Sequence, residues 1–233
     1  MQDTAEVLKK LDLSSTRSKL LAIIANLRGA QDAVAFEEIK YLGFPFSISE
    51  TFQQRNANSS IAESLIRVEE IQSLCVKHNK ELVVYISMAF GNPYNDEWNS
   101  DIVIKWTDKL QSMGIKILAL SDTIGVSNPE NISYLFKHLI PAFKNVEFGA
   151  HLHSTKENSL EKIKATAESG CLRFDSAIHG FGGCPMAKDD LTGNIATEDI
   201  VSYFHSVSTD LGLNTDALLH SYEKSWEIFN NYH

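Results

Sequence analysis

Residues 146–153 read VEFGAHLH, a short and mostly apolar run that ends in two histidines. An apolar run of this length, bordered by helix-like patterns on both sides, predicts a buried strand. Strand-like and helix-like stretches alternate along almost the whole chain, and this alternation predicts a parallel sheet. The other predicted strands are residues 20–25, 39–46, 81–88, 115–121 and 171–178. We therefore expect six strands, each followed by a helix.

The helices are predicted from apolar periodicity and from residues that typically begin or end a helix. Asn128 and Pro129 suit a helix start, because asparagine caps free amides and proline has no amide to leave unpaired. Residues 46–60, FSISETFQQRNANSS, are predicted as a loop. The predicted helices are residues 29–36, 60–79, 100–112, one from Pro129 onward, 159–169, 197–211 and 215–230.

Two architectures connect parallel strands through helices: an open sheet with helices on both faces, and a barrel with helices outside. The fingerprint GxGxxG does not follow the first predicted strand, and there is no phosphate-binding loop of the Walker type. Periodicity alone does not decide between the two. The 233 residues are slightly fewer than the roughly 250 that are typical of a (β/α)8 barrel.

The composition is that of one globular domain, which we expect to span residues 1–233. Lys and Arg number 21 against 30 Asp and Glu, a net charge of −9, and no basic run is present, so nucleic acid is not an expected partner. No apolar run approaches the roughly 20 residues of a membrane helix, and we expect an intracellular protein without membrane contact. The 3 cysteines are widely spaced and predict no disulfide framework.

His151 and His153 stand at the carboxyl end of their predicted strand. Because side chains alternate along a strand, both imidazoles are expected on the same face. Parallel α/β proteins place their active sites at this end of the strands. Two interpretations stay open: the imidazoles share one divalent ion, or they are partly buried histidines that bond to neighbours.

Asp122 ends the preceding predicted strand and so lies on the same rim of the sheet. Its carboxylate suits a metal ligand, an orienting group or a general base. The alternative is that it caps the turn amides of residues 123–125.

A glycine-rich segment, residues 179–194, follows the last predicted strand. It holds Cys184, and the glycines before this thiol allow the backbone to approach a ligand closely. We assign reactivity to Cys184, because Cys75 and Cys171 have the positions of packing residues. Asn194 offers a carboxamide oxygen to a metal, although a Gly-Asn pair is usually a turn.

Four motifs, in this order and at these intervals, resemble the 3-hydroxy-3-methylglutaryl-CoA lyase family. They are SDTIGV (121–126), HLH (151–153), GFGGCP (180–185) and GNIATED (193–199). The similarity extends from residue 4 to about residue 219, and the GGCP loop is its most specific element. The family belongs to a superfamily of metal-dependent TIM-barrel enzymes, so the resemblance implies a TIM (β/α)8 barrel.

By resemblance, His151, His153 and Asn194 are metal ligands for Mg²⁺ or Mn²⁺. Catalytic roles are implied for Cys184 as the thiol of a mobile loop, for His151, and for Asp122 as a catalytic or orienting acid. The implied reaction is the cleavage of 3-hydroxy-3-methylglutaryl-CoA to acetyl-CoA and acetoacetate, as in leucine degradation and ketone-body formation. The expected small-molecule partner is an acyl-CoA substrate. The oligomer that we consider is a homodimer, formed with a second copy of the chain. The expected location is the cytoplasm, or the mitochondrial matrix in a eukaryote.

One family motif has no counterpart here. The first barrel strand of the family carries ExGxRDG, whose Asp binds the metal and whose Arg stabilises negative charge, yet no Arg-Asp pair occurs in the 233 residues. We therefore expect an N-terminally truncated barrel of about six strand–helix units, and little or no turnover by this chain. Two alternatives remain: a related Claisen-type acyl-CoA synthase or aldolase, and a non-catalytic paralogue that binds metal or acyl-CoA.

Overall fold

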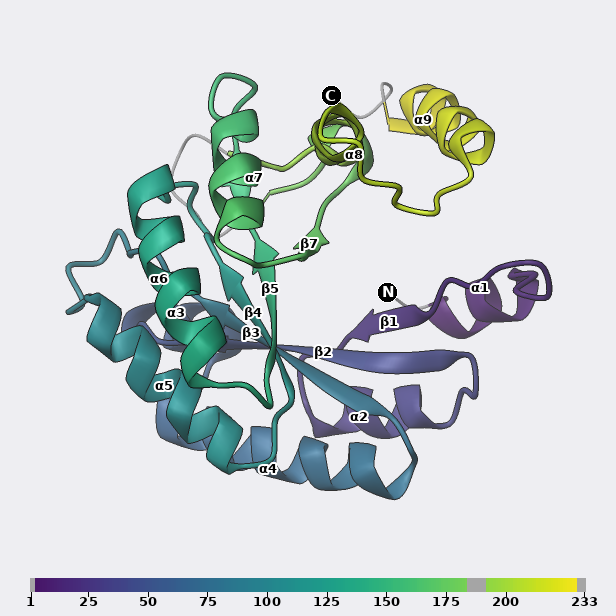
Figure 1. Cartoon of the computed structure of the whole chain (residues 1–233). Helices are drawn as coiled ribbons and strands as arrows, with labels where there is room; N and C mark the ends of the chain where they lie inside the picture. Colours follow the sequence, from purple (N-terminus) through teal and green to yellow (C-terminus); the bar gives the residue numbers. More distant parts are fainter. Residues whose placement is uncertain (1–2, 184–191, 230–233) are drawn as a thin grey trace.

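The fold is built on one sheet of six parallel strands, in the order β1-β2-β3-β4-β5-β7. The structure is a computed structural model that describes residues 3–183 and 192–229. The strands are β1 (Leu20–Ile23), β2 (Ile39–Ser47), β3 (Glu81–Ser87), β4 (Ile117–Ser121), β5 (Glu147–His151) and β7 (Arg173–Asp175). The sheet curls, with helices on its outer face (Figure 1). The predicted barrel architecture, with six strand–helix units, is confirmed.

Four of the helices that follow the strands begin after residues whose side chains accept a hydrogen bond from the first turn. Asn26, Asn99 and Asn128 each cap a helix, and Ser60 forms a reciprocal capping box with Glu63. The helices are α2 (Leu27–Val34), α4 (Ile61–Lys77), α5 (Ser100–Ser112), α6 (Pro129–Ala142), α7 (Ser159–Glu168), α8 (Thr197–Ser206) and α9 (Thr215–Phe229). The predicted start at Asn128 and Pro129 is therefore confirmed.

The hydrophobic core lies between the sheet and this outer layer of helices. Alternation along β3 sends Val84 and Ile86 toward the helices, where both are fully buried. Tyr85 and Ser87 point the other way and line the hollow inside the curl. The outer face thus holds the fold together, while the inner face is left free for polar groups.

Two parts of the chain differ from the sequence-based prediction. The predicted loop 46–60 contains a helix, α3 (Glu50–Ala57), because the Ser49 hydroxyl accepts from the amide of Phe52 and the Asp96 carboxylate accepts from the amide of Thr51. The predicted strand 146–153 is interrupted at Leu152. After it, β6 (His153–Ser154) leaves the sheet and pairs antiparallel with β8 (Gly193–Asn194).

Smaller differences are found at three other places, including the predicted strand 171–178, of which only β7 (173–175) forms. A short helix that was not predicted, α1 (Thr4–Lys10), precedes β1. The helix α8 ends at Ser206, earlier than the predicted residue 211, and a single 3-10 turn, η1 (Ile178–Gly180), follows β7. These differences do not change the order of the strands.

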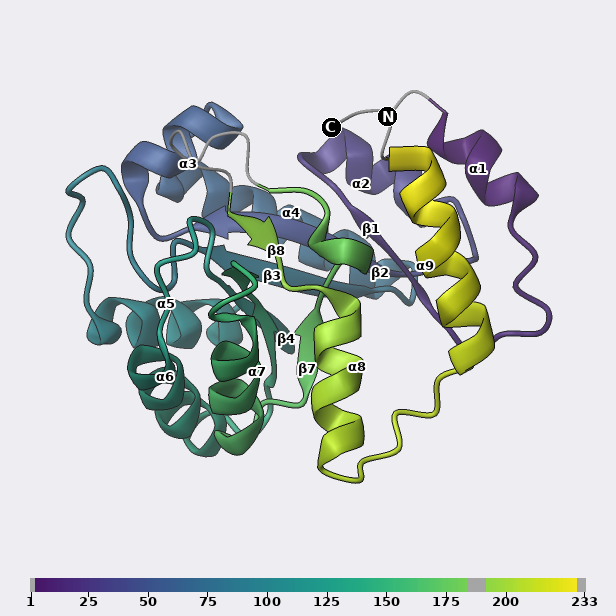
Figure 2. The same ribbon diagram turned by 90° about the horizontal axis from the view of Figure 1, so that it is seen from above.

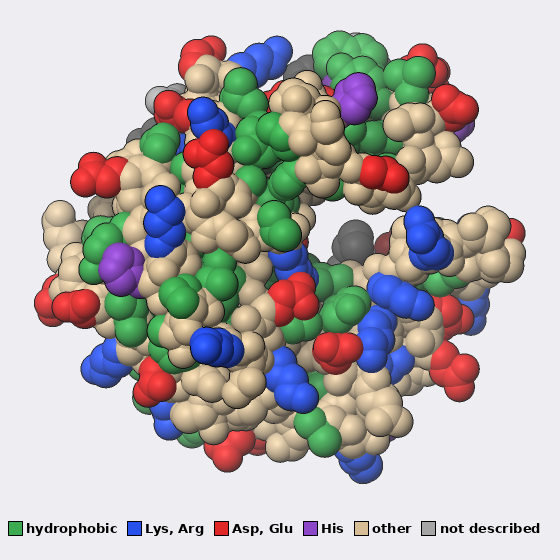
Figure 3. Space-filling model, in the orientation of Figure 1, with side chains coloured by type: hydrophobic (Ala, Val, Ile, Leu, Met, Phe, Trp, Pro, Cys, Tyr) green, Lys and Arg blue, Asp and Glu red, His purple; other side chains and the backbone are tan. Residues whose placement is uncertain are grey.

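The curled sheet is open between β1 and β7. Among the described residues, each of these strands pairs on one side only, and Figure 3 shows a hollow on this side of the molecule. From above, α9 lies on the side of β1, away from α5 and α6 (Figure 2), and none of its described residues is buried. Arg17 bridges the two sides through a hydrogen bond to the carbonyl of Gly212. Within residues 3–183 and 192–229, no helix has both the length and the apolar character needed to cross a membrane.

Candidate active site

A cavity of about 690 Å³ opens at the carboxyl ends of the strands, inside the curl of the sheet. Most of its polar lining comes from β3, β4, β5, β6, β7 and β8, or from the residues directly after them. The polar residues that line it include Tyr85, Ser87, Ser121, Thr123, His151, His153, Asp175, Ser176 and Asn194. Three of the predicted site residues therefore meet in one cavity, at the end of the strands where parallel α/β folds hold their ligands.

Both histidines of the HLH motif line this cavity, as predicted. His151 is the last residue of β5, and its ring lies 5.5 Å from the ring of His153, centroid to centroid. Leu152 between them is buried in the core. The alternation of side chains along β5 explains why His151 points into the cavity. The position of His153 instead depends on the pairing of β6 with β8, in which His153 lies opposite Asn194.

Each of the two imidazoles has a neighbour at its Nδ1 atom. The Nδ1 atom of His153 lies 3.0 Å from the carbonyl oxygen of Thr192. A carbonyl only accepts, so this nitrogen carries the proton and the Nε2 atom keeps a free lone pair. The Nδ1 atom of His151 lies 3.4 Å from Oδ2 of Asp175. This arrangement, with an acceptor behind the ring, is typical of histidines that bind a metal.

Burial and the neighbouring His151 lower the pKa of His153 below its usual value. The imidazole is consequently neutral at neutral pH, which is the form that binds a metal ion.

Asn194 supplies the third of the predicted donors. Its side-chain NH₂ donates to the carbonyl of Phe181 at 2.9 Å, so that its Oδ1 atom is left to accept. A Cβ atom at Gly180 would lie 2.8 Å from the Asn194 carbonyl oxygen, and Gly180 has a φ of +67°. Glycine is therefore needed for the chain before Cys184 to pass close to Asn194.

His151, His153 and Asn194 provide part of the ligand set that a divalent ion needs. Two imidazoles and one carboxamide oxygen are donors that Mn²⁺ accepts, while Mg²⁺ prefers oxygen. In the described part of the chain, no three His, Cys, Asp or Glu side chains are grouped closely enough to hold a metal. A complete site therefore requires the asparagine and at least one further ligand.

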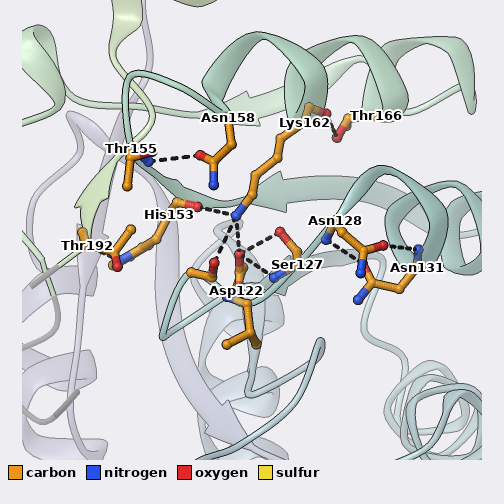
Figure 4. Close-up of polar contacts among 12 residues, drawn as sticks. Asp122, Ser127, Asn128, Asn131, His153, Thr155, Asn158, Lys162, Thr166 and Thr192 are labelled. Atoms are coloured by element: carbon orange, nitrogen blue, oxygen red, sulfur yellow. Dashed lines mark hydrogen bonds and ion pairs between the residues drawn. The ribbon is translucent and has the colours of Figure 1, made fainter. Parts of the chain in front are cut away.

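Asp122 does not line the cavity, because its side chain turns toward the helix layer. Its carboxylate accepts from the amides of Val126 and Ser127, from the Ser127 hydroxyl and from the ammonium of Lys162 (Figure 4). The predicted capping of the turn is thus present, shifted from residues 123–125 to residues 126 and 127. Because its carboxylate contacts the turn before α6 and Lys162 of α7, the orienting role fits Asp122, and its catalytic role remains a prediction.

The structure describes two of the three cysteines. Cys75 and Cys171 are buried, as predicted for packing residues, and burial raises the pKa of their thiols to about 11 and about 12. Cys184 lies outside the described residues.

Three residues near the site were not found from the sequence. Lys162 is fully buried and forms an ion pair with Asp122, although a lysine on a helix usually indicates a solvent-exposed face. Asp175 reaches His151 only because the register of β5 and β7 pairs them. Burial, followed by the charge of Asp175, raises the pKa of the Tyr85 phenol, whose ring meets His151 edge-on. The alternation of β3 was the one sequence signal that could have found Tyr85.

Comparison with known proteins supports the motifs. The sequence model of the HMGL-like family matches residues 1–223. The cytoplasmic 3-hydroxy-3-methylglutaryl-CoA lyase of Rattus norvegicus is 34% identical over 200 residues, which are 85% of this chain and 56% of the relative. A hydroxymethylglutaryl-CoA lyase of Bacillus subtilis is 30% identical over 219 residues, 94% of this chain and 72% of the relative. The chain thus spans between about half and three quarters of these relatives.

Solved structures agree with the sequence comparisons. An HMG-CoA lyase of Bacillus subtilis superposes with a TM-score of 0.90 at 29% identity, over 99% of this chain and 76% of that one. An HMG-CoA lyase of Acinetobacter baumannii, in complex with coenzyme A and 3-methylmalate, superposes with a TM-score of 0.87 at 27% identity, over 98% of this chain and 74% of that one.

Proposed function

The chain belongs to the HMGL-like family, and from this premise we propose that it carries most of the active site of a carbon–carbon lyase. The proposed reaction is the cleavage of 3-hydroxy-3-methylglutaryl-CoA to acetyl-CoA and acetoacetate. The observation that carries this proposal is the pair of histidines at the cavity, each with an acceptor near Nδ1, beside Asn194. The Oδ1 atom of Asn194 accepts no hydrogen bond from residues 3–183 and 192–229.

A divalent ion, Mn²⁺ or Mg²⁺, would be held by His151, His153 and Asn194 together with a ligand that the described residues do not supply. Such an ion acts as a Lewis acid toward the hydroxyl and carbonyl oxygens of a substrate. Neutral imidazoles are required for this role, and the buried environment of His153 supports the neutral form.

The residues of the chain would then handle protons. A base removes the proton of the substrate hydroxyl, the C2–C3 bond breaks, and its electron pair remains on the acetyl-CoA fragment as an enolate. His151 faces the cavity, but a ring whose Nε2 atom binds the metal and whose Nδ1 atom carries the proton has no lone pair for this step. The base role of His151 therefore applies only where His151 is not a metal ligand. We assign the return of a proton to the enolate carbon to the Cys184 thiol, on the strength of the GGCP motif alone.

The substrate class is proposed from the relatives. The Acinetobacter baumannii structure has coenzyme A bound, and the curated relatives are named as lyases of a CoA thioester. An acyl-CoA is therefore the substrate we propose.

The metal part of this proposal can be tested without turnover. Calorimetric titration with Mn²⁺ is expected to show binding to the wild-type chain and at least about tenfold weaker binding to His153→Ala. His138→Ala is the matched control, because His138 lies on the exposed face of α6 and bonds only within its own helix, to the Tyr134 carbonyl. Equal affinity of the wild type and His153→Ala would exclude His153 as a ligand.

A further inference from the structure

The ammonium group of Lys162 lies at the centre of a buried network beside the candidate active site. Lys162 is on α7, and its side chain is completely buried. Its Nζ atom has three acceptors: the carbonyl oxygen of His153 at 2.8 Å, Oδ2 of Asp122 at 3.0 Å and the carbonyl oxygen of Gly125 at 3.1 Å. An ammonium has three N–H donors, so all of them are used.

The last backbone hydrogen bond between the two segments that supply these acceptors runs from the amide of Asp122 to the carbonyl of His151, at 2.9 Å. Beyond it, no strand pairing among the described residues joins the turn after β4 to the chain at His153. Asp122 and Gly125 belong to the turn after β4, whereas His153 begins β6 (Figure 4). One lysine from the helix layer therefore fixes the turn after β4 to the chain at the second histidine.

The network closes through Thr192. A Cβ atom at Gly125 would lie 2.7 Å from the side chain of Thr192, so the turn packs directly against this residue. The carbonyl of Thr192 in turn accepts the Nδ1 proton of His153. Contacts thus run from Lys162 to Gly125, Thr192 and His153, and back to Lys162.

We propose that Lys162 is a positioning residue that sets the ring orientation of His153, so that its Nε2 atom is presented to the cavity. The inference rests on the proposed function only where it counts His153 among the metal ligands. Lys162 itself does not line the cavity, and its contact with His153 is to the backbone carbonyl rather than to the ring. It acts through the backbone carbonyl of His153 and through the turn that supports Thr192.

The charge of the network limits which variants are informative. Lys162→Met alone leaves the buried Asp122 carboxylate without its counter-charge, and a buried unpaired charge is strongly destabilising. The double variant Lys162→Met, Asp122→Asn removes both charges. Replacing both members of a buried ion pair by neutral groups of similar volume is often tolerated, so this variant is expected to fold.

The first measurement is Mn²⁺ affinity by calorimetry, with the melting temperature followed in parallel. The double variant is expected to bind Mn²⁺ about 10- to 100-fold more weakly than the wild type, as is usual when a group that orients a metal ligand is lost. Lys164→Met is the matched control, because Lys164 lies on the same helix and pairs only with the exposed Glu168. A folded double variant that binds Mn²⁺ as tightly as the wild type would overturn the proposal.

The second measurement needs no metal. Long-range ¹H–¹⁵N spectra of the histidine rings report which nitrogen carries the proton. In the wild type and in Lys164→Met, His153 is expected as a single tautomer with the proton on Nδ1. In the double variant, a mixture of tautomers is expected, because the ring loses its fixed distance from the Thr192 carbonyl.

The two measurements separate the inference from the proposed function. The absence of Mn²⁺ binding to the wild-type chain, together with a change of tautomer in the double variant and none in Lys164→Met, supports the positioning role and contradicts the metal site. An unchanged tautomer in the folded double variant contradicts the positioning role, whatever the metal affinity.

Discussion

The Nδ1 atom of His151 lies 3.4 Å from Oδ2 of Asp175, across the two residues that β5 and β7 place side by side. Both atoms are buried, and within the described residues neither has a well-formed hydrogen bond. A small rotation of either side chain would bring them to hydrogen-bond distance. Such a contact would fix the proton on Nδ1 and leave Nε2 of His151 for the cavity.

Asp175→Asn keeps the shape of this side chain and removes its charge. We expect Mn²⁺ affinity to fall about 10-fold, because a neutral amide is a weaker acceptor behind a metal-binding imidazole. Titration with Mn²⁺, followed by electron paramagnetic resonance, measures the free ion directly. Glu147→Gln is the control, because Glu147 is at the opposite end of β5 and its partner is Arg173. Unchanged affinity in Asp175→Asn would show that the carboxylate does not act on His151.

The lowered pKa of His153 predicts a pH-dependent stability for the metal-free chain. Below the usual histidine pKa of about 6.5, the unfolded chain takes up a proton that the folded chain does not. The free energy of unfolding should therefore fall as the pH drops from 7 through 6.5 toward the lower pKa of the folded state. The slope from this residue is at most about 1.4 kcal/mol per pH unit.

His153→Gln isolates this contribution. Urea unfolding in the presence of EDTA, at several pH values between 5 and 7.5, should give a shallower slope for the variant than for the wild type. Equal slopes would mean that His153 is protonated to the same extent in the folded and unfolded states.

Local patterns predicted the strands well, because a buried parallel strand is a continuous apolar run. Four of the helices that follow are also preceded by a capping residue that is visible in the sequence. The prediction was wrong for α3. Residues 50–57 are mostly polar and follow two serines, so they have the composition of a loop, and the helix forms because Ser49 and the distant Asp96 satisfy its first amides.

The candidate site could be predicted only where one strand carries the signal. His151 and His153 are visible as a pair in the sequence, and motif order adds Asn194. Lys162 could not be found in this way, because its acceptors belong to segments that meet only in the folded chain. Asp175 depends on the register between β5 and β7, which no local pattern determines.

The cysteines give a prediction about reactivity. With thiol pKa values of about 11 and about 12, Cys75 and Cys171 are thiolates in only about one molecule in a thousand or fewer at pH 8. We expect one of the 3 thiols to react quickly with a disulfide reagent in the folded chain, and all 3 after denaturation. Cys184→Ser should remove the fast reaction. A fast reaction that survives this substitution would remove the assignment of reactivity to Cys184.

Gly125 lies in the turn beside the site, and Gly170, which follows α7, is its matched control. Both have positive φ, +73° and +89°, so alanine at either position costs about 1 kcal/mol or more in backbone strain. A Cβ atom at Gly170 would meet Ile140 at an ordinary 3.7 Å, whereas at Gly125 it would meet Thr192 at 2.7 Å. Gly125→Ala should therefore destabilise the chain by about 1–3 kcal/mol more than Gly170→Ala, as expected for overpacking. Urea unfolding of the two variants measures the difference, and equal losses would mean that Thr192 moves aside freely.

The rate of acetoacetate production tests whether these 233 residues carry out the reaction of the family. Because no Arg-Asp pair is present, the chain has no counterpart of the motif that supplies a carboxylate ligand and a charge-stabilising arginine in the family. Such electrostatic groups often contribute about 3 kcal/mol each to a reaction barrier, a factor of about 100 in rate. We expect little or no acetoacetate from the chain incubated with 3-hydroxy-3-methylglutaryl-CoA and Mg²⁺.

A fusion experiment gives the positive counterpart. The part of the Bacillus subtilis lyase that its match to this chain does not cover can be joined to residues 1–233. Among the described residues, β1 and β7 each have one unpaired edge that could accept further strands. If the cavity is otherwise competent, the fusion should produce acetoacetate at least about 100-fold faster than the chain alone, and His151→Ala in the fusion should abolish the gain. Near-normal turnover by the unfused chain would instead mean that residues already present supply the missing charge.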